Sequence, residues 1–135
     1  MGILGWLGLD GGCESEPVAL TDENFTAEVV DSSLPVVMDV WSAGCQPCRV
    51  LVPTMRKLAC KYDGRVKVAH LDVAAAPHVI SHLGVSGTPT TLFFKDGKVI
   101  ERVVGVRGQH YFEEIIETDL LGMEPPGEAR QAEVN

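Results

Sequence analysis

The chain has 135 residues, a length that suits one domain with a sizeable hydrophobic core. Its apolar content of 45% and charged content of 22% are ordinary for a globular protein. The formal net charge of −8 argues against nucleic acid and against an anionic membrane surface as partners, because no basic patch is available to meet phosphate. No apolar run approaches the length of a membrane span.

Both ends of the chain differ in composition from its middle. Residues 1–17 are rich in glycine and large apolar residues, and they are expected to form a flexible leader, with a docking segment as the alternative. Residues 122–135 are rich in Pro, Glu and Ala, and are expected to be disordered. The single folded domain is therefore predicted to cover residues 18–121.

Within that domain, hydrophobic periodicity and turn residues predict nine elements. They are a short edge strand at 18–20, a helix from Thr21 to about 31–33, a buried strand at 36–41, a helix from 45 to about 62 with Pro53 inside it, a strand at 66–73, a short helix at 77–83, strands at 90–95 and 98–104, and a closing helix marked by apolar residues from 111 to 120. Early strands separated by helices favour parallel pairing, whereas the Asp96-Gly97 turn predicts a hairpin. The expected class is α/β, with a central mixed sheet flanked by helices.

The most informative motif is Cys45-Gln46-Pro47-Cys48, which follows the buried strand and begins the long helix. A thiol at a helix start has its thiolate stabilised by the helix dipole and by free backbone N–H groups. This position predicts that Cys45 is the partly exposed attacking thiolate and that Cys48, about one turn further in, is the resolving thiol. Pro47 suits the first turn of a helix, where its missing N–H costs little.

Metal binding is the alternative function for this pair. A structural zinc site needs four ligands, and Cys13 and Cys60 have no spaced partner. His78 and His82 stand four positions apart on the short predicted helix, which keeps a metal site open as a minority interpretation. Because a CxxC motif beside a βαβ pattern is typical of redox proteins, we predict a redox pair and no metal or other cofactor.

Cysteine usage also bears on the compartment. The apolar N-terminal residues lack a basic region, so no cleaved signal peptide is expected. A chain of this size does not need a disulfide framework, and we therefore expect a reducing cytoplasm. Cys13 and Cys60 are expected to be spectator thiols, with a regulatory or intermolecular disulfide as the alternative.

Asp39 is a candidate for proton transfer. It interrupts the buried strand between Met38 and Val40, where a carboxyl group is costly. A buried carboxyl has a raised pKa and can exchange a proton with a nearby thiol. The alternatives are that Asp39 pairs with a lysine such as Lys67, or that it faces water at a strand edge.

Two stretches resemble the thioredoxin family. The segment VVMDVWSAGCQPCRVLVP is similar to the active-site segment of that family, with its strand Asp, its Trp, its CxPC motif and a later Pro in the helix. The segment GTPTTLFFKDGKV resembles the family's cis-proline loop and hairpin, and Gly105 follows the last strand as it does there. The likeness covers roughly residues 18–121.

The resemblance implies a thioredoxin-like fold and a thiol–disulfide oxidoreductase that reduces protein disulfides and is itself reduced by a thioredoxin reductase. We also expect the chain to be a monomer. It also implies a cis bond between Thr88 and Pro89 facing the disulfide, with the Thr88 backbone free to pair with an extended substrate strand. The expected substrate groove comprises Gly44, Gln46, Pro47, Thr88, Pro89 and Gly105. A disulfide isomerase, a reductase dedicated to one partner and a binding module are the alternative functions.

Four positions depart from the family pattern. Gly44 stands where the family has a Trp, Gln46 where it has a Gly, Thr88 where it has an Ile, and His70 where it has a Lys near the buried Asp. Trp41 is expected to pack behind the site and, with His70, to support it. These differences leave the redox mechanism intact and affect the choice of partner and the redox potential.

Overall fold

The computed structural model describes residues 13–123, and its centre is a five-stranded mixed sheet in the order β1-β3-β2-β4-β5. The strands are β1 (Val18–Leu20), β2 (Val36–Trp41), β3 (Lys67–Asp72), β4 (Thr90–Lys95) and β5 (Lys98–Val104). β3 pairs in parallel with both β1 and β2, whereas β4 pairs antiparallel with β2 and β5. The predicted α/β class, mixed sheet and edge position of the first strand are confirmed.

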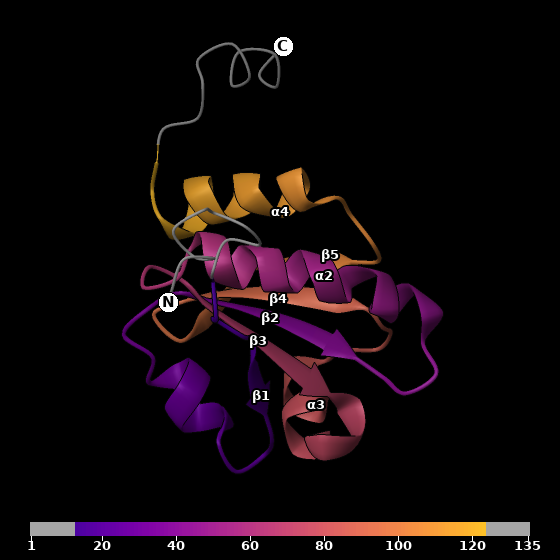
Figure 1. Cartoon of the computed structure of the whole chain (residues 1–135). Helices are drawn as coiled ribbons and strands as arrows, with labels where there is room; N and C mark the ends of the chain where they lie inside the picture. The colour runs from indigo at the N-terminus through magenta and orange to yellow at the C-terminus, as the bar shows by residue number, and fades with distance from the viewer. Residues whose placement is uncertain (1–12, 124–135) are drawn as a thin grey trace, which may run out of the picture.

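Helices cover both faces of the sheet (Figure 1). On one face lie α2 (Gln46–Lys61) and α4 (Gln109–Ile115), the latter continued by the π-helix η4 (Ile116–Leu120). On the other face lie the π-helix η2 (Thr26–Val30) and α3 (Pro77–Leu83), which the short 3₁₀-helix η3 (Val73–Ala75) precedes. Within the described residues, no helix combines the length and apolar character that crossing a membrane requires.

Two predicted elements are shorter than expected. The first helix contains a single π-helical stretch with Phe25 as its N-cap. Thr21, the predicted cap, instead closes the turn before the helix, where its Oγ1 accepts hydrogen bonds of 3.2 Å from the backbone amides of Glu23 and Asn24. The strand predicted at 66–73 ends at Asp72, because the Asp72 carboxylate caps the next turn by accepting a hydrogen bond from the Ala74 amide.

Successive side chains of β2 point to opposite faces of the sheet, and this decides which of them lie beneath α2. Val36, Met38 and Val40 point into the core that η2 and α3 cover, whereas Val37 points into the core under α2 and α4. Asp39 shares the parity of Val37 and therefore faces α2. In the strand register it stands between His70 on β3 and Thr91 on β4. The fold thus places a polar row across the middle of the sheet, directly under the helix that carries the cysteines.

The structure contradicts the expectation that Cys13 and Cys60 are spectator thiols. They form a disulfide with each other, with a Cα–Cα distance of 5.8 Å that lies within the usual range. The partners are 47 positions apart, so no local spacing in the sequence indicates the pairing. Most of the predicted leader and tail, residues 1–12 and 124–135, lie outside the described residues, and the domain boundaries stay predictions.

Candidate active site

The site begins at a tight turn that leads from β2 into α2. The amide of Cys45 donates to the carbonyl of Ser42 at 3.2 Å, and Gly44 adopts a φ of +80° within this turn. A left-handed φ favours glycine, because a side chain there would crowd the backbone. Gly44 therefore does more than leave the rim open where the family carries a Trp; it allows the turn that sets the start of the helix.

Cys45 is the N-cap of α2, and its Sγ accepts a hydrogen bond of 3.1 Å from the amide of Cys48. The two cysteines form a disulfide with a Cα–Cα distance of 5.3 Å. Cys45 is half-buried, whereas Cys48 is only 4% exposed. The backbone N–H on Cys45 Sγ and the helix dipole both stabilise a thiolate at Cys45 once the disulfide is reduced. Gln46 and Pro47, in the first turn of the helix, are exposed.

Asp39 is 3% exposed, and burial raises the pKa of its carboxyl group to about 7. Its Oδ1 atom has no hydrogen-bond partner within residues 13–123. Both alternatives for this residue are wrong. Lys67 Nζ lies 2.8 Å from Glu28 Oε1 rather than at Asp39. Moreover, β2 is flanked by strands on both sides, so Asp39 does not face water at an edge.

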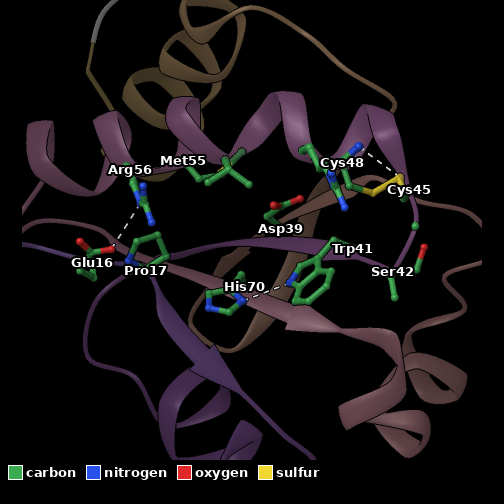
Figure 2. A pocket seen from close by; sticks show the side chains of 14 residues that line it. Glu16, Pro17, Asp39, Trp41, Ser42, Cys45, Cys48, Met55, Arg56 and His70 are labelled. Atoms are coloured by element: carbon green, nitrogen blue, oxygen red, sulfur yellow. Dashed lines mark hydrogen bonds and ion pairs between the residues drawn. A yellow bond between two sulfur atoms is a disulfide. The ribbon is translucent and has the colours of Figure 1, made fainter.

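His70 neighbours Asp39 in the register, but it does not supply a counter-charge. Trp41 Nε1 donates a hydrogen bond of 3.1 Å to His70 Nδ1, which fixes that nitrogen as an acceptor (Figure 2). Burial lowers the pKa of His70, although the Asp72 carboxylate acts in the opposite direction. The ring of His70, which stands where the family has a Lys, therefore brings no counter-charge to the Asp39 carboxyl.

A cavity of about 480 Å³ joins these groups, and α2 forms its roof (Figure 2). The Cys45–Cys48 disulfide lies at one end, and Asp39, Trp41 and His70 line the middle. The opposite end is lined by Glu16, Pro17, Met55 and Arg56. The buried carboxyl group and the buried sulfur of the pair thus line one cavity, in which a proton can pass between them directly or through water.

A second loop reaches the site from the start of β4. The hydroxyls of Ser42 and Thr88 lie 2.7 Å apart, which joins this loop to the turn before Cys45. The Thr88–Pro89 peptide bond is cis. The amide of Gly105, whose φ is +95°, donates to the carbonyl of Pro89 at 2.9 Å. The structure therefore brings together all three segments of the groove that the resemblance implies.

Comparison with known proteins decides the family. The sequence model of the family described as Thioredoxin matches residues 16–118. Thioredoxin 1 of Nostoc sp. (strain PCC 7120) is 37% identical over 91 residues, and thioredoxin 1 of Synechococcus elongatus is 40% identical over 91; both matches cover 67% of this chain and 85% of the relative. Thioredoxin of Mycolicibacterium smegmatis is 36% identical over 98 residues, which is 71% of this chain and 88% of the relative.

The chain belongs to the thioredoxin family. It is accordingly a thiol–disulfide oxidoreductase, and the family identified from the two sequence stretches is confirmed. The metal alternative finds no support in the described part of the chain. His78 Nδ1 lies 2.9 Å from Asp22 Oδ2, and residues 13–123 contain no group of three or more His, Cys, Asp or Glu side chains placed to hold a metal ion.

One polar residue of this thioredoxin-family site escaped sequence reasoning. Thr91 is fully buried and lies opposite Asp39 in the register. Like Asp39 Oδ1, its Oγ1 has no hydrogen-bond partner in the described part of the chain. The neighbouring Thr90 differs, since its hydroxyl donates to the carbonyl of Gly87 at 2.7 Å. A threonine pair in an otherwise apolar buried strand was the available signal, but only the register shows that one of the two faces the acid.

Proposed function

We propose that this member of the thioredoxin family reduces protein disulfides, with Cys45 as nucleophile. The Cys45 thiolate attacks one sulfur of the substrate disulfide, and the displaced substrate sulfur takes up a proton. Asp39 then accepts the proton of the Cys48 thiol, and the Cys48 thiolate attacks Cys45 in the mixed disulfide. The second substrate sulfur leaves Cys45 as a thiolate and takes up the proton held by Asp39, whereas the proton on the first came from solvent. The substrate thus departs as a dithiol with two electrons and two protons gained, and Cys45 and Cys48 remain as a disulfide.

The single observation that carries this proposal is the asymmetry between the two cysteines. Cys45 is accessible and has a backbone N–H on its sulfur, whereas Cys48 is buried and shares a cavity with Asp39. A general base works best when its pKa lies near the working pH, and burial raises the pKa of Asp39 to about 7. The arrangement suits attack by Cys45 and delayed deprotonation of Cys48.

The groove suits a protein substrate in an extended conformation. Gly44, Gln46 and Pro47 form its rim on one side, and Thr88, Pro89 and Gly105 form the other. The side chains of Val104 and Val106, on either side of Gly105, are 61% and 37% exposed. Exposed apolar side chains beside an open rim favour docking of a polypeptide over docking of a small polar molecule.

Partners and compartment belong to the same proposal. The oxidised pair would be reduced by a thioredoxin reductase, with the chain acting as a monomer and with no cofactor beyond its own disulfide. We place this activity in the cytoplasm, as cysteine usage suggests. Structural disulfides are rare in such a compartment, and the disulfides found there are usually transient and catalytic or redox-sensing, which favours a redox role for the Cys13–Cys60 bond.

Insulin reduction with NADPH and a thioredoxin reductase tests the proposal. We expect turnover in the full chain and loss of turnover in Cys45→Ser, whereas Cys60→Ser, which keeps both cysteines of the CxxC pair, should still turn over, at a rate that reports the effect of removing the Cys13–Cys60 bond. Activity on a scrambled disulfide substrate without net reduction would instead assign the chain to the isomerases. Retained turnover in Cys45→Ser would overturn the proposed role of this cysteine.

A further inference from the structure

The Cys13–Cys60 disulfide fastens the segment 13–17 to the C-terminal half of α2. One helical turn before Cys60, Arg56 Nε lies 3.5 Å from Glu16 Oε1 (Figure 2). Both of these side chains are largely exposed, at 63% and 68%, so the ion pair alone is weak. The covalent bond is therefore the main attachment of the segment to the helix.

This segment is also a wall of the active-site cavity. Glu16 and Pro17 line the end of the cavity opposite the Cys45–Cys48 pair, where Arg56 and Met55 meet them from α2 (Figure 2). Directly after Pro17 the chain enters β1, whose pairing with β3 holds it in place. The wall is thus anchored by strand pairing on one side and by the disulfide on the other, and only the second anchor can be released by chemistry.

The disulfide is reachable by a redox partner. Cys13 and Cys60 are both partly exposed. The amide of Ser15 donates to Cys13 Sγ at 3.4 Å, so a thiolate on Cys13 would be stabilised. Cys60, in contrast, lies at the C-terminal end of α2, where the helix dipole disfavours negative charge. Cys13 is therefore the better leaving group and Cys60 the sulfur that is attacked.

We propose that Cys13–Cys60 is a second redox site, whose reduction by a dithiol releases the Glu16–Pro17 wall and opens the end of the cavity opposite the Cys45–Cys48 pair. A thiolate of the dithiol attacks Cys60 Sγ, the Cys13–Cys60 bond breaks, and Cys13 leaves as a thiolate and takes up a proton. The second thiol of the dithiol then attacks the mixed disulfide. Cys60 is released and protonated, the donor is oxidised to a disulfide, and two electrons have passed to the pair.

The donor is a protein or small-molecule dithiol, and the reduced Cys45–Cys48 pair of a second copy has the required chemistry. Opening the wall admits water to Asp39, and so changes the surroundings in which the Cys48 proton is transferred. That effect on activity rests on the proposed function. The redox site itself and the movement of the wall do not depend on it.

The test uses a full-length Cys45→Ser/Cys48→Ser variant, in which only Cys13 and Cys60 can react. The variant is equilibrated in mixtures of reduced and oxidised dithiothreitol, and its free thiols are counted by alkylation and mass spectrometry. We expect both thiols to appear together in one two-electron transition. Thiols that alkylate without any reductant would overturn the proposal, as would a bond that survives the mixtures that fully reduce Cys45–Cys48 in the unmodified chain.

Movement of the wall is measured on the same variant with Trp6→Phe added, which leaves Trp41 in the cavity as the sole tryptophan. On reduction we expect stronger quenching of Trp41 fluorescence by acrylamide. We also expect amide exchange in residues 13–20 to become faster by about tenfold or more, which corresponds to roughly 1.4 kcal/mol in the free energy of opening. If neither the acrylamide quenching of Trp41 nor the amide exchange of residues 13–20 changes on reduction, the wall is not released.

The matched control adds Cys13→Ser and Cys60→Ser to the same variant. With or without reductant, its Trp41 quenching and its amide exchange must equal those of the reduced variant. Insulin reduction by the unmodified chain separates the two proposals. If that activity is missing while the redox transition and wall movement are present, the proposed function fails and the second redox site stands.

Discussion

The two ends of helix α2 carry the two disulfides of the described chain, and they place the same chemical group in opposite surroundings. At the N-terminal end, Cys45 caps the helix and its sulfur receives a backbone N–H at 3.1 Å. At the C-terminal end, roughly 20 Å away, Cys60 lies among free carbonyl groups and Lys61 is the last helical residue. A thiolate is favoured at the first end and disfavoured at the second.

The two bonds also close loops of very different length. Cys45 and Cys48 are 3 positions apart, whereas Cys13 and Cys60 are 47 apart. A bond that closes a long loop restricts the unfolded chain more strongly than one that closes a short loop. The bond at the N-terminal end thus has the more reactive thiol, and the bond at the C-terminal end closes the longer loop; each property can be tested separately.

The largest expected difference lies in thiol reactivity. In the fully reduced protein near pH 7, Cys45 should be alkylated by iodoacetamide about tenfold or more faster than Cys60, because a thiol at a helix start has a lower pKa and a larger thiolate fraction. Mass spectrometry of quenched time points gives both rates from one sample. Equal rates would show that the position in the helix does not decide reactivity here.

The disulfides should also differ in stability. Under oxidising conditions, Cys13→Ser should lower the free energy of unfolding by about 4 kcal/mol, the chain-entropy value for a loop of this length, whereas Cys48→Ser should cost about 2 kcal/mol through loss of its much shorter loop. Denaturant unfolding measures both. When both proteins are reduced, Cys13→Ser and the unmodified chain should have the same free energy of unfolding. A difference that remains would have to come from packing around Cys13.

The buried carboxyl group of Asp39 makes the free energy of unfolding depend on pH. Between about pH 4 and pH 7 the folded protein keeps a proton on Asp39 that the unfolded chain releases, since burial raises the pKa of this group from its ordinary 3.8 to about 7. The free energy of unfolding should therefore fall as pH rises through this window, by at most roughly 4 kcal/mol, and stay level above it.

Asp39→Asn is the control for this pH dependence, because the substitution removes the titrating group from the cavity. Unfolding of the oxidised protein should then show little change across the same window. A wild-type curve that rises from pH 4 to pH 7 would mean that the carboxylate is stabilised in the folded state, contrary to its burial without a hydrogen-bond partner for Oδ1.

A smaller effect is expected at the turn that begins the helix. Gly44→Ala should cost roughly 1 kcal/mol, because φ is +80° there although no atom lies within 4 Å of the added Cβ. Gly87→Ala is the matched control, as that site has equal space and no left-handed φ, and it should cost nothing. Denaturant unfolding compares the two, and equal losses would show that the turn does not demand glycine.

Much of this arrangement follows from sequence patterns. The apolar run of β2, the Asp96-Gly97 hairpin and the Pro77–Leu83 helix are local signals, and the structure has these elements where the sequence predicts them. The order of exposure within Cys45–Cys48 follows from their place in the first turn of a helix. These features depend on neighbours within a few positions of one another.

What the sequence could not predict depends on contacts between distant segments. The Cys13–Cys60 bond joins the N-terminal segment to a helix that comes much later in the chain, and two isolated cysteines carry no spacing signal. The orientation of Thr91 toward Asp39 depends on the register between two strands. Lys67 forms its ion pair with Glu28, a residue of η2, and not with Asp39. This choice of partner depends on how η2 packs beside β3, which the sequence does not show.

The most direct test of the account is to trap the mixed disulfide with Cys48→Ser, which removes the resolving thiol. After incubation of the reduced variant with a protein disulfide substrate, peptide mapping identifies the cysteine that holds the substrate. The account predicts a covalent adduct at Cys45, at the N-terminal end of α2. An adduct predominantly at Cys60 or Cys13 would contradict it.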